Sequence, residues 1–329
     1  TTLFPALQLF SLPGVTDQIA LFSQYIGIAA LILMAWGQIM ATRLPGIETV
    51  FGGLDQVYVV HKWAGITAMV AILLHDTIDA DMDGLGRETV LTEIAETLGE
   101  LSLYGLLILV VISVATFVPY HLWKWTHKAM GAFFVAAALH FVFILKPFSM
   151  SDPAGLFAGG FCIAGIAAYV YTLLPDRMRR AHAYRIDDVS QTGGATAITM
   201  SPINRQMRHR PGQFGVFKFG GINDDEPHPF SFSAAANEKG TVRITVKALG
   251  DYTTRLASKV AVGKTVHVQG PFGRFERRST KQPEIWIAGG IGITPFLAWA
   301  QALSATDGPV ALYYAFRSAQ DAPHLDEIR

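Results

Sequence analysis

Two pairs of histidines with matched spacing are the residues of this chain best suited to chemistry. His61 and His75 lie fourteen residues apart in the apolar stretch Val59–Asp76, and His127 and His140 lie thirteen apart in a second one. On a helix, fourteen residues leave two side chains roughly 40° apart around the axis and about 21 Å apart along it. An imidazole inside a membrane is costly without a partner, and a haem iron could be that partner. Two such helices could therefore ligate two stacked haems.

The opposing interpretation is four unrelated histidines that hydrogen-bond neighbouring helices. Two pairs at matching depths favour haem, and an iron with two axial imidazoles has no open position, which suits electron transfer. On an ideal helix His140 lies about 220° around from His127, so either tighter winding, for which Gly131 is a candidate, or helix crossing must align them. Phe133, between these two histidines, is expected either to pack or to relay electrons between haems.

The elements that carry these histidines are expected to span a membrane. The chain has 329 residues, of which 51% are hydrophobic and 16% charged, and most of the apolar excess precedes residue 176. Residues 1–17 have no basic start and no unbroken apolar core, so they are expected to be an extracytoplasmic connection instead of a signal peptide. Five apolar runs follow, each near the roughly 20 residues that a bilayer requires: 18–41, 57–79, 98–119, 124–146 and 155–175.

Basic residues predict the orientation of these runs, because Lys and Arg in short loops favour the cytoplasmic side. Three junctions on one side carry them: Arg43 and Lys62, Lys124 and Lys128, and Arg177, Arg179 and Arg180. The other side is mostly acidic, with Lys146 as the one basic exception. We therefore expect a multi-pass cell-membrane protein with His61 and His127 near the cytoplasm and His75 and His140 toward the outside.

The acidic outer segment Asp79–Gly84 has the D-x-D-x-D-G opening of a calcium loop. The twelfth position of that register is Val90, where a calcium loop has Glu. A solvated acidic surface that attracts cations is therefore at least as well supported as a calcium site.

Two further features limit the possible functions. The formal charge of zero argues against nucleic acid, which normally requires a clustered basic surface. The single cysteine, Cys162, excludes a disulfide within one chain, and we expect it to pack within a helix. Nothing in the sequence points to a protein partner or an oligomeric state.

After the basic turn 177–185, alternating runs separated by Gly, Pro and Asn predict a small antiparallel β-barrel. Its motifs are PGQF, HPFSFSAA, GDYTTRL before a helix, and GPFG at the end of a strand. Hydroxyls, glycines and helix amides of this kind suit a pyrophosphate and the edge of a flavin ring.

The last segment, Glu284–Trp299, reads as strand, G-G-x-G-x-T-P turn and helix, which is the form of a dinucleotide phosphate cradle. A second strand, VALYYAF, follows. One strand, one helix and one more strand predict an α/β nucleotide domain that is incomplete at Arg329. Arg317 is as well explained by solvation as by contact with a 2′-phosphate, so NADPH and NADH both remain open.

The ordered set of histidine pairs and glycine motifs resembles the ferric reductase and NADPH oxidase family of transmembrane flavocytochromes. The soluble half is similar to ferredoxin-NADP reductase. The resemblance implies two haem b groups, an inner one held by His61 and His127 and an outer one by His75 and His140. It implies FAD at His228, Pro229, Phe230, Ser231, Ser233, Gly250, Thr253, Gly270, Pro271, Phe272 and Gly273. It implies the NAD(P)H pyrophosphate at Gly289, Gly290, Gly292, Thr294 and Pro295.

Two departures from the family pattern concern the ends of the chain. The family commonly has six membrane helices where five are counted here, and it ends with a Cys-Gly segment and an aromatic residue that are not found here. We therefore expect a fragment of a longer protein. The expected domains are a transmembrane bis-haem bundle at 18–176, an FAD-binding barrel at 177–282 and the start of an NAD(P)-binding α/β domain at 283–329.

The resemblance implies electron transfer from cytoplasmic NAD(P)H through FAD and two haems to an acceptor outside. The acidic outer segment favours ferric chelate as that acceptor over oxygen, which would give superoxide or hydrogen peroxide. Two alternatives of another class are a membrane-tethered flavin reductase with structural histidines and a non-enzymatic haem module.

Overall fold

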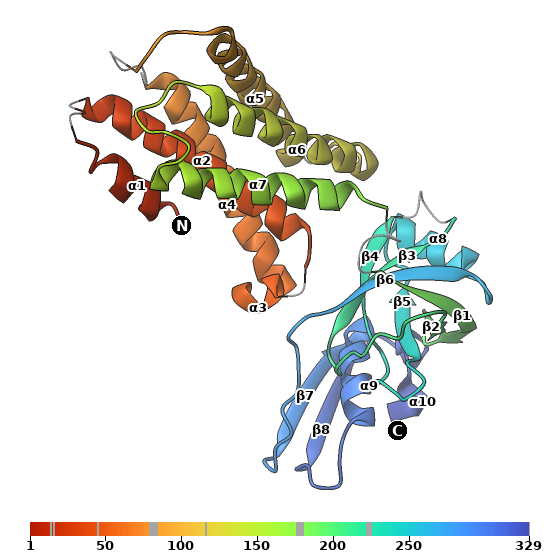
Figure 1. Cartoon of the computed structure of the whole chain (residues 1–329). Coiled ribbons are helices and arrows are strands. Elements are labelled where there is room, and N and C mark those ends of the chain that lie inside the picture. The colour runs from red at the N-terminus through yellow and green to blue at the C-terminus, as the bar shows by residue number, and fades with distance from the viewer. Residues whose placement is uncertain are drawn as a thin grey trace. The chain divides into compact units, whose positions relative to one another are not determined.

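The computed structural model describes residues 1–328 except positions 14, 16, 45, 79–84, 116, 176–180 and 222–225, and the side chains of Tyr120 and His121. The chain divides into two compact units. The first comprises Thr1–Phe51 and Asp55–Leu174, and the second comprises Gly52–Leu54 and Pro175–Arg329. The predicted order of an all-α bundle, an antiparallel barrel and an α/β segment is confirmed (Figure 1).

The first unit is a helix bundle. Among its described residues, five helices are long and apolar enough to cross a membrane, as predicted. Two short helices, α1 (Leu3–Leu9) and α3 (Ile47–Phe51), accompany them. The five long helices are α2 (Gln18–Ala41), α4 (Leu54–Thr77), α5 (Val90–Val114), α6 (Tyr120–Phe143) and α7 (Pro153–Leu173).

Helix α5 begins at Val90, not at 98 where its apolar run was expected to start. A capping box explains the difference, because Thr89 and Thr92 satisfy each other's backbone amides at the helix start. The acidic side chains that follow do not prevent the first turns from forming. Lys62 similarly lies inside α4 and not in the preceding loop.

Helix α2 is the best buried of the five long helices. Its core residues Leu31, Ile32 and Ala35 pack with Phe134 of α6 and Cys162 of α7. Small side chains let membrane helices approach closely, which is the main source of attraction between them. Large apolar side chains on the outer faces of α4 and α5 remain exposed, as a lipid-facing surface requires.

The second unit begins with a six-stranded antiparallel sheet in the order β4-β3-β6-β1-β2-β5. An isolated bridge between Phe232 and Ile244 joins the end of β4 to β5 and closes the sheet into a barrel. The strands are β1 (Ala181–Thr192), β2 (Ala195–Pro202), β3 (Phe214–Phe219), β4 (Pro227–Ser231), β5 (Val242–Lys247) and β6 (Thr265–Phe272), with α8 (Asp251–Lys259) between the last two.

The interpretation of 177–185 as a basic turn is wrong from Ala181 on, where β1 begins. Tyr184 and Ile186 alternate into the barrel core and are fully buried, so inward burial and pairing with β6 outweigh the polar composition.

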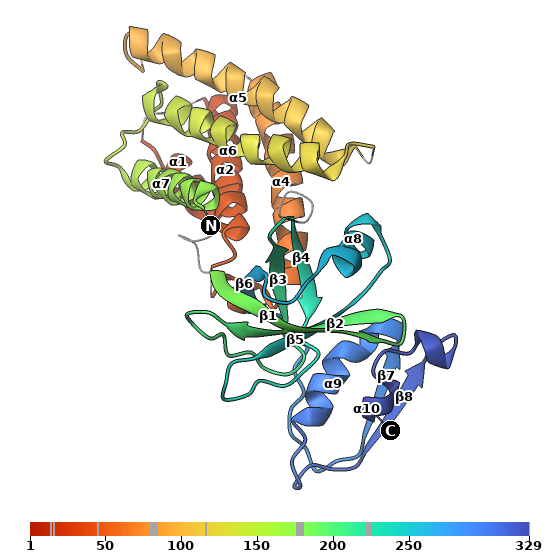
Figure 2. The ribbon, with the colours of Figure 1, turned by 90° about the vertical axis from the view of Figure 1, so that its right-hand side faces the viewer.

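A βαβ segment completes the second unit. Strands β7 (Glu284–Gly289) and β8 (Val310–Ala315) are parallel, and the turn η3 (Gly290–Ile293) and helix α9 (Thr294–Gln301) connect them. Trp286, Phe296 and Trp299 form the core between sheet and helix. The short elements η4 (Ala319–Asp321) and α10 (Leu325–Ile328) follow β8 (Figure 2).

Candidate functional site

The inner histidine pair is brought together from two helices. His61 of α4 and His127 of α6 have ring centroids 6.0 Å apart, with the ring planes tilted by 54°. Two metal–imidazole bonds of about 2 Å on opposite sides of one ion, plus about 1 Å from each nitrogen to its ring centre, give about 6 Å. The spacing of the two imidazoles therefore fits one iron between them.

In the outer pair, His75 and His140, each ring hydrogen-bonds through Nδ1 to a backbone carbonyl of another helix. His75 Nδ1 lies 2.9 Å from the carbonyl oxygen of Ser23 on α2, and 3.1 Å from its hydroxyl. His140 Nδ1 lies 2.8 Å from the carbonyl of Ala95 on α5. His75 and His140 are near enough to interact electrostatically. A donor bond from Nδ1 fixes the tautomer and leaves Nε2 as the ligating atom.

The inner rings have equivalent partners. His127 Nδ1 lies 3.2 Å from the hydroxyl of Ser113 on α5, and its ring stacks on Trp123 at 4.8 Å between centroids. His61 hydrogen-bonds the backbone of Gly37 on α2. Each predicted ligand is thus oriented by a hydrogen bond to a helix other than its own, as metal-binding histidines usually are by a neighbouring group. Sequence reasoning missed these partners, although serines inside apolar runs were a usable signal.

Helix α6 is one continuous α-helix from Tyr120 to Phe143, so the tighter winding allowed for between its histidines is not found. Phe133 lies between them and packs with Met69, Leu103 and Leu106 in a cluster formed by α4, α5 and α6. Phe133 is therefore a packing residue, and it lies at a depth between the inner and outer histidine pairs. A relay role for Phe133 stays a prediction.

Charged residues of both signs surround the outer pair. Asp76 is close enough to His75, and Glu96 to His140, to interact electrostatically. Lys146 acts on His140 with the opposite sign and donates hydrogen bonds to the carbonyls of Val142 and Ile144. The predicted calcium or acidic segment 79–84 lies outside the described residues.

Three of the flavin motifs meet on neighbouring strands of the barrel. Phe214, the last residue of PGQF, begins β3 and pairs with Ser231 of β4 on one side and with Phe272 of β6 on the other. Helix α8 contacts β4 elsewhere, because Tyr252 stacks on His228 with 3.5 Å between ring centroids, and His228 pairs with Phe217, three residues along β3 from Phe214. Segments far apart in sequence therefore meet on β4, at two different places.

The motif His228–Ser231 divides its side chains between two faces of β4. His228 stacks on Tyr252 and lies 3.4 Å from the Glu226 carboxylate, and Phe230 packs on the barrel core. Pro229 is exposed and Ser231 is half-buried on the other face. Of the predicted flavin contacts in this strand, these two side chains are the accessible ones.

In the predicted phosphate motifs, the threonine caps a helix, whereas two of the glycines adopt backbone conformations that favour glycine. The Thr253 hydroxyl accepts the backbone N–H groups of Leu249 and Gly250, each at 3.0 Å, so it caps α8. Pro271 precedes Phe272, whose ring lies 5.9 Å from the Phe214 ring between centroids and is tilted by 44° to it. Gly270 and Gly273 have φ of +140° and +98°, which favour glycine.

The dinucleotide turn is open on its outer side. A β-carbon added at Gly289, Gly290 or Gly292 would meet no heavy atom within 4 Å, so a phosphate could approach the backbone closely. Thr294 begins α9, but its N–H already bonds the Ile291 carbonyl, and Pro295 has no N–H, so neither residue offers a backbone amide to an anion. The Tyr314 hydroxyl donates to the Gly290 carbonyl at 3.1 Å and steadies the turn.

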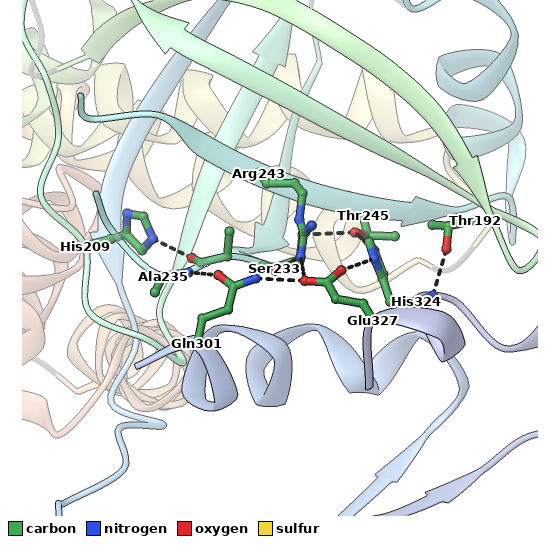
Figure 3. A network of polar contacts seen from close by, with 10 residues as sticks. Thr192, His209, Ser233, Ala235, Arg243, Thr245, Gln301, His324 and Glu327 are labelled. Atoms are coloured by element: carbon green, nitrogen blue, oxygen red, sulfur yellow. Dashed lines mark hydrogen bonds and ion pairs between the residues drawn. The ribbon is translucent and has the colours of Figure 1, made fainter. Parts of the chain in front are cut away.

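Ser233 does not join the flavin surface. It is fully buried, and its hydroxyl lies 2.9 Å from Thr245 Oγ1 inside the polar network of Figure 3. Arg317, exposed after β8, is available to a ligand or to solvent.

A family model, described as the ferric reductase like transmembrane component, matches residues 26–139. Residues 26–139 form a ferric reductase-like transmembrane component. Three of the four predicted haem histidines lie within this component, and His140 follows it directly. The match thus covers the bundle that the histidine pairs occupy.

The chain is also similar to curated proteins over part of its length. It is 29% identical over 147 residues to the toluate 1,2-dioxygenase electron transfer component of Pseudomonas putida, covering 44% of this chain and 43% of that protein. It is 29% identical over 143 residues to a flavohemoprotein of Candida norvegensis, covering 41% and 36%. The chain therefore spans about two fifths of the curated relatives that it matches.

Among solved structures, phthalate dioxygenase reductase aligns with a TM-score of 0.43 and 19% identity, over 47% of this chain and 50% of that one.

Proposed function

We propose that this chain acts in a transmembrane oxidoreductase that moves electrons from cytoplasmic NAD(P)H to an acceptor on the outer face. FAD and two haem b groups would be its resident cofactors. The observation that supports the proposal most is the arrangement of four histidines in the bundle. His61 and His127 have ring centroids 6.0 Å apart, and each of the four rings hydrogen-bonds a helix other than its own.

The bound cofactors supply the hydride and one-electron chemistry. The residues of the chain bind and orient them. His61 and His127 would hold the inner haem, and His75 and His140 the outer one. Pro229, Ser231 and the amides of α8 would bind FAD, while the Gly289–Thr294 turn would bind the nucleotide pyrophosphate.

A ferric chelate is the acceptor that we favour. Asp76 and Glu96 lie close to the outer histidines, and their negative charge attracts cationic species to this end of the bundle. Initial rates with a ferric chelate and with oxygen alone measure the preference. Superoxide formed in a one-electron match to NAD(P)H consumption, unaffected by added ferric chelate, would exclude the ferric assignment.

Oxygen is the second candidate because of Lys146. Its ammonium group lies close to His140 and donates hydrogen bonds to the backbone carbonyls of Val142 and Ile144. A cation there would stabilise an anion formed from oxygen. In that case Lys146→Gln should lower superoxide yield while ferric reduction is kept.

The deciding experiment is an absorption spectrum of the purified protein with haem and flavin quantified. We expect two haems per chain in the wild type and one in His75→Leu, with flavin kept in both. His182→Leu is the matched control, because His182 lies in β1 and bonds the carbonyl of Arg205.

The other outcomes identify the alternatives. Flavin without a Soret band would indicate a membrane-tethered flavin reductase. Haem without flavin, and no effect of Ser231→Ala, would indicate a haem module without reductase activity. Two haems retained in His75→Leu would contradict the ligand assignment.

A further inference from the structure

Two loops of the second unit are strongly basic. They are residues 203–213, between β2 and β3, and residues 273–283, between β6 and β7. Together they contain seven basic residues and one acidic residue, whereas the rest of the stretch from 181 to 329 contains ten basic and twelve acidic residues. The excess positive charge of this stretch therefore lies in the two loops.

The two loops lie side by side. Arg210 Nη1 of the first loop lies 2.9 Å from the Glu276 carboxylate of the second. The side-chain amide of Gln213 donates to the carbonyl of Gly273 at 3.2 Å and makes another connection. The exposed basic residues of the loops, which we call the basic face, are Arg205, Arg208, Arg210, Arg274, Arg278 and Lys281.

The first loop presents its arginines from a fixed backbone. Met207 and His209 are 3% and 5% exposed, and the Met207 amide donates to the Tyr184 hydroxyl at 2.9 Å. His209 Nε2 lies 2.9 Å from a backbone carbonyl that follows β4. Arg208 and Arg210 alternate with these buried residues and are exposed. Burial of the alternate side chains therefore directs the two arginines to the surface.

In the second loop, folding uses one cation and leaves the others outside. Arg277 is paired with Glu284 at 2.7 Å and with Asp307 at 3.1 Å, and 10% of its side chain is exposed. Its neighbours Arg274 and Arg278 are exposed. The charge of Arg277 is thus compensated within the fold, and the basic face does not include it.

The proposed nucleotide site does not account for the basic residues of the second loop. This loop enters β7 at Glu284, whereas the dinucleotide turn begins after Gly289, at the other end of the strand. A strand of this length separates its two ends by about 17 Å. Phosphates bound at the turn are therefore not the partner of Arg278 or Lys281.

Chain connectivity keeps the basic face near a bilayer. Helix α7, which is long and apolar enough to cross a membrane, ends at Leu173, and His182 follows nine residues later in β1. His182 Nδ1 lies 3.1 Å from the backbone carbonyl oxygen of Arg205. Nine residues span at most about 30 Å, even when fully extended. The first loop therefore cannot move far from the membrane that α7 would cross.

Apolar side chains accompany the cations. Ile203 of the first loop and Phe275 of the second are 49% and 53% exposed. An anionic bilayer surface attracts Lys and Arg, and its headgroup region accepts aromatic and aliphatic side chains. This mixture of positive charge and apolar surface fits a lipid surface better than a free phosphate.

We propose that the basic face docks on anionic lipid headgroups of the membrane that holds the helix bundle. The inference rests on the membrane location in the proposed function, but not on haem, flavin or the electron acceptor. Each basic residue close to an anionic surface strengthens the attraction by about fivefold. Several such residues on two adjacent loops would keep the second unit on the membrane surface.

The test uses the whole protein in nanodiscs of phosphatidylcholine, either alone or mixed with an equal part of phosphatidylglycerol. All discs contain a lipid with a spin label on its headgroup. A fluorophore on a cysteine in place of Asn204, which is exposed beside Arg205, reports approach to the lipid through quenching. The native Cys162 is buried and should remain unlabelled. We expect several-fold stronger quenching in the anionic discs and loss of this difference at high salt, which screens the charges.

Charge variants in the labelled protein identify the residues responsible. Arg205→Gln and Arg208→Gln should each lower the ratio of docked to undocked protein by about fivefold in the anionic discs. Lys239→Gln and Lys264→Gln are the matched controls, because both lysines are exposed outside the two loops. Quenching in these controls should equal that of the parent protein.

The outcomes separate this inference from the proposed function. Equal quenching in neutral and anionic discs would overturn the docking, and salt-dependent binding of polyglutamate in that case would assign the basic face to an acidic protein. Equal effects of the arginine and lysine variants would also overturn it. Lipid-dependent quenching in a protein that binds neither haem nor flavin would support the docking and contradict the proposed function.

Discussion

At the scale of single residues, the site depends on groups that orient the histidines. Ser23, Ala95 and Ser113 present a carbonyl or a hydroxyl to Nδ1 of a ring on another helix. These groups are small, so the helices approach closely enough for the bond to form. Each of these hydrogen bonds fixes the orientation of a histidine ring that the apolar side chains around it would leave free to rotate.

Gly99 offers a residue-scale test on α5. A β-carbon at this position would lie 2.7 Å from Nδ1 of His140, closer than real contacts allow. Gly99→Val should displace the ring, reduce the haem content from two to one, and cost roughly 1–3 kcal/mol of stability by overpacking. Pyridine haemochrome quantification and thermal unfolding measure the two effects.

Gly160→Val is the control, since a β-carbon there meets nothing within 4 Å. Equal haem content in both variants would mean that His140 does not hold a haem.

At the scale of elements, the turn between β7 and α9 requires both a left-handed backbone conformation and open space beside the backbone for a ligand. Gly290 has φ +49°, which favours glycine, whereas Gly289 has φ −126°, which any residue adopts. Both glycines leave open space beside the backbone. Strain and ligand access can therefore be measured separately within one turn.

We expect Gly290→Ala to lower stability by about 1 kcal/mol, the cost of a left-handed side-chain residue. Gly289→Ala should leave stability unchanged. Both should weaken NAD(P)H binding, because each methyl occupies the space through which a phosphate approaches. Thermal unfolding and calorimetric titration report the two quantities, and unchanged binding in both variants would place the nucleotide elsewhere.

A cluster of ionised groups fixes the segment between barrel and βαβ unit. Arg277 bonds Glu284 at 2.7 Å and Asp307 at 3.1 Å, and Glu284 also accepts from the Trp286 indole at 2.9 Å. The hydrogen bond from Arg277 lowers the pKa of Glu284. Hydrogen bonds from Ser279, the Ser304 amide and Arg277 lower the pKa of Asp307.

Acid should therefore destabilise this junction. Carboxyls with depressed folded-state pKa values stabilise the fold above their unfolded values of 4.5 and 3.8 and lose that effect as the pH falls through the folded values. The melting temperature of the second unit should fall steeply below about pH 4. Asp307→Asn should flatten this dependence, and an unchanged slope would show that the cluster contributes nothing.

At the scale of the whole molecule, function requires that the two ends of the bundle face different compartments. Basic residues near the ends of α2, α4 and α6 predict that His61 and His127 lie at the cytoplasmic end. The single native cysteine, Cys162, is buried in α7 and should not react with a polar reagent. The chain is therefore suited to labelling from outside.

A cysteine in place of Ser151, in the loop before α7, should react with an impermeant maleimide in intact cells. A cysteine in place of Lys239, exposed in the barrel, should react only after lysis. The wild type is the control for background. The reverse pattern would invert the orientation and exchange the roles of the inner and outer pairs.

The sequence by itself determined the features that depend on local pattern. Apolar length gave the five membrane helices, histidine spacing gave the candidate ligands, and strand, glycine turn and helix gave the βαβ segment. These signals lie within one element, where chain geometry alone fixes which residues are near. The strand β1 was missed in part because pairing and inward burial, not composition, decided it.

Only the tertiary structure decided which groups meet across elements. It places Ser23 at hydrogen-bond distance from the His75 ring and Tyr252 against His228, and it buries Ser233 in the polar network that contains His324. These partners come from elements distant in sequence, and several of them act through backbone carbonyls that are the same for every residue type. The residue types indicated which histidines are candidate ligands, but the packing of the helices determined how their rings are oriented.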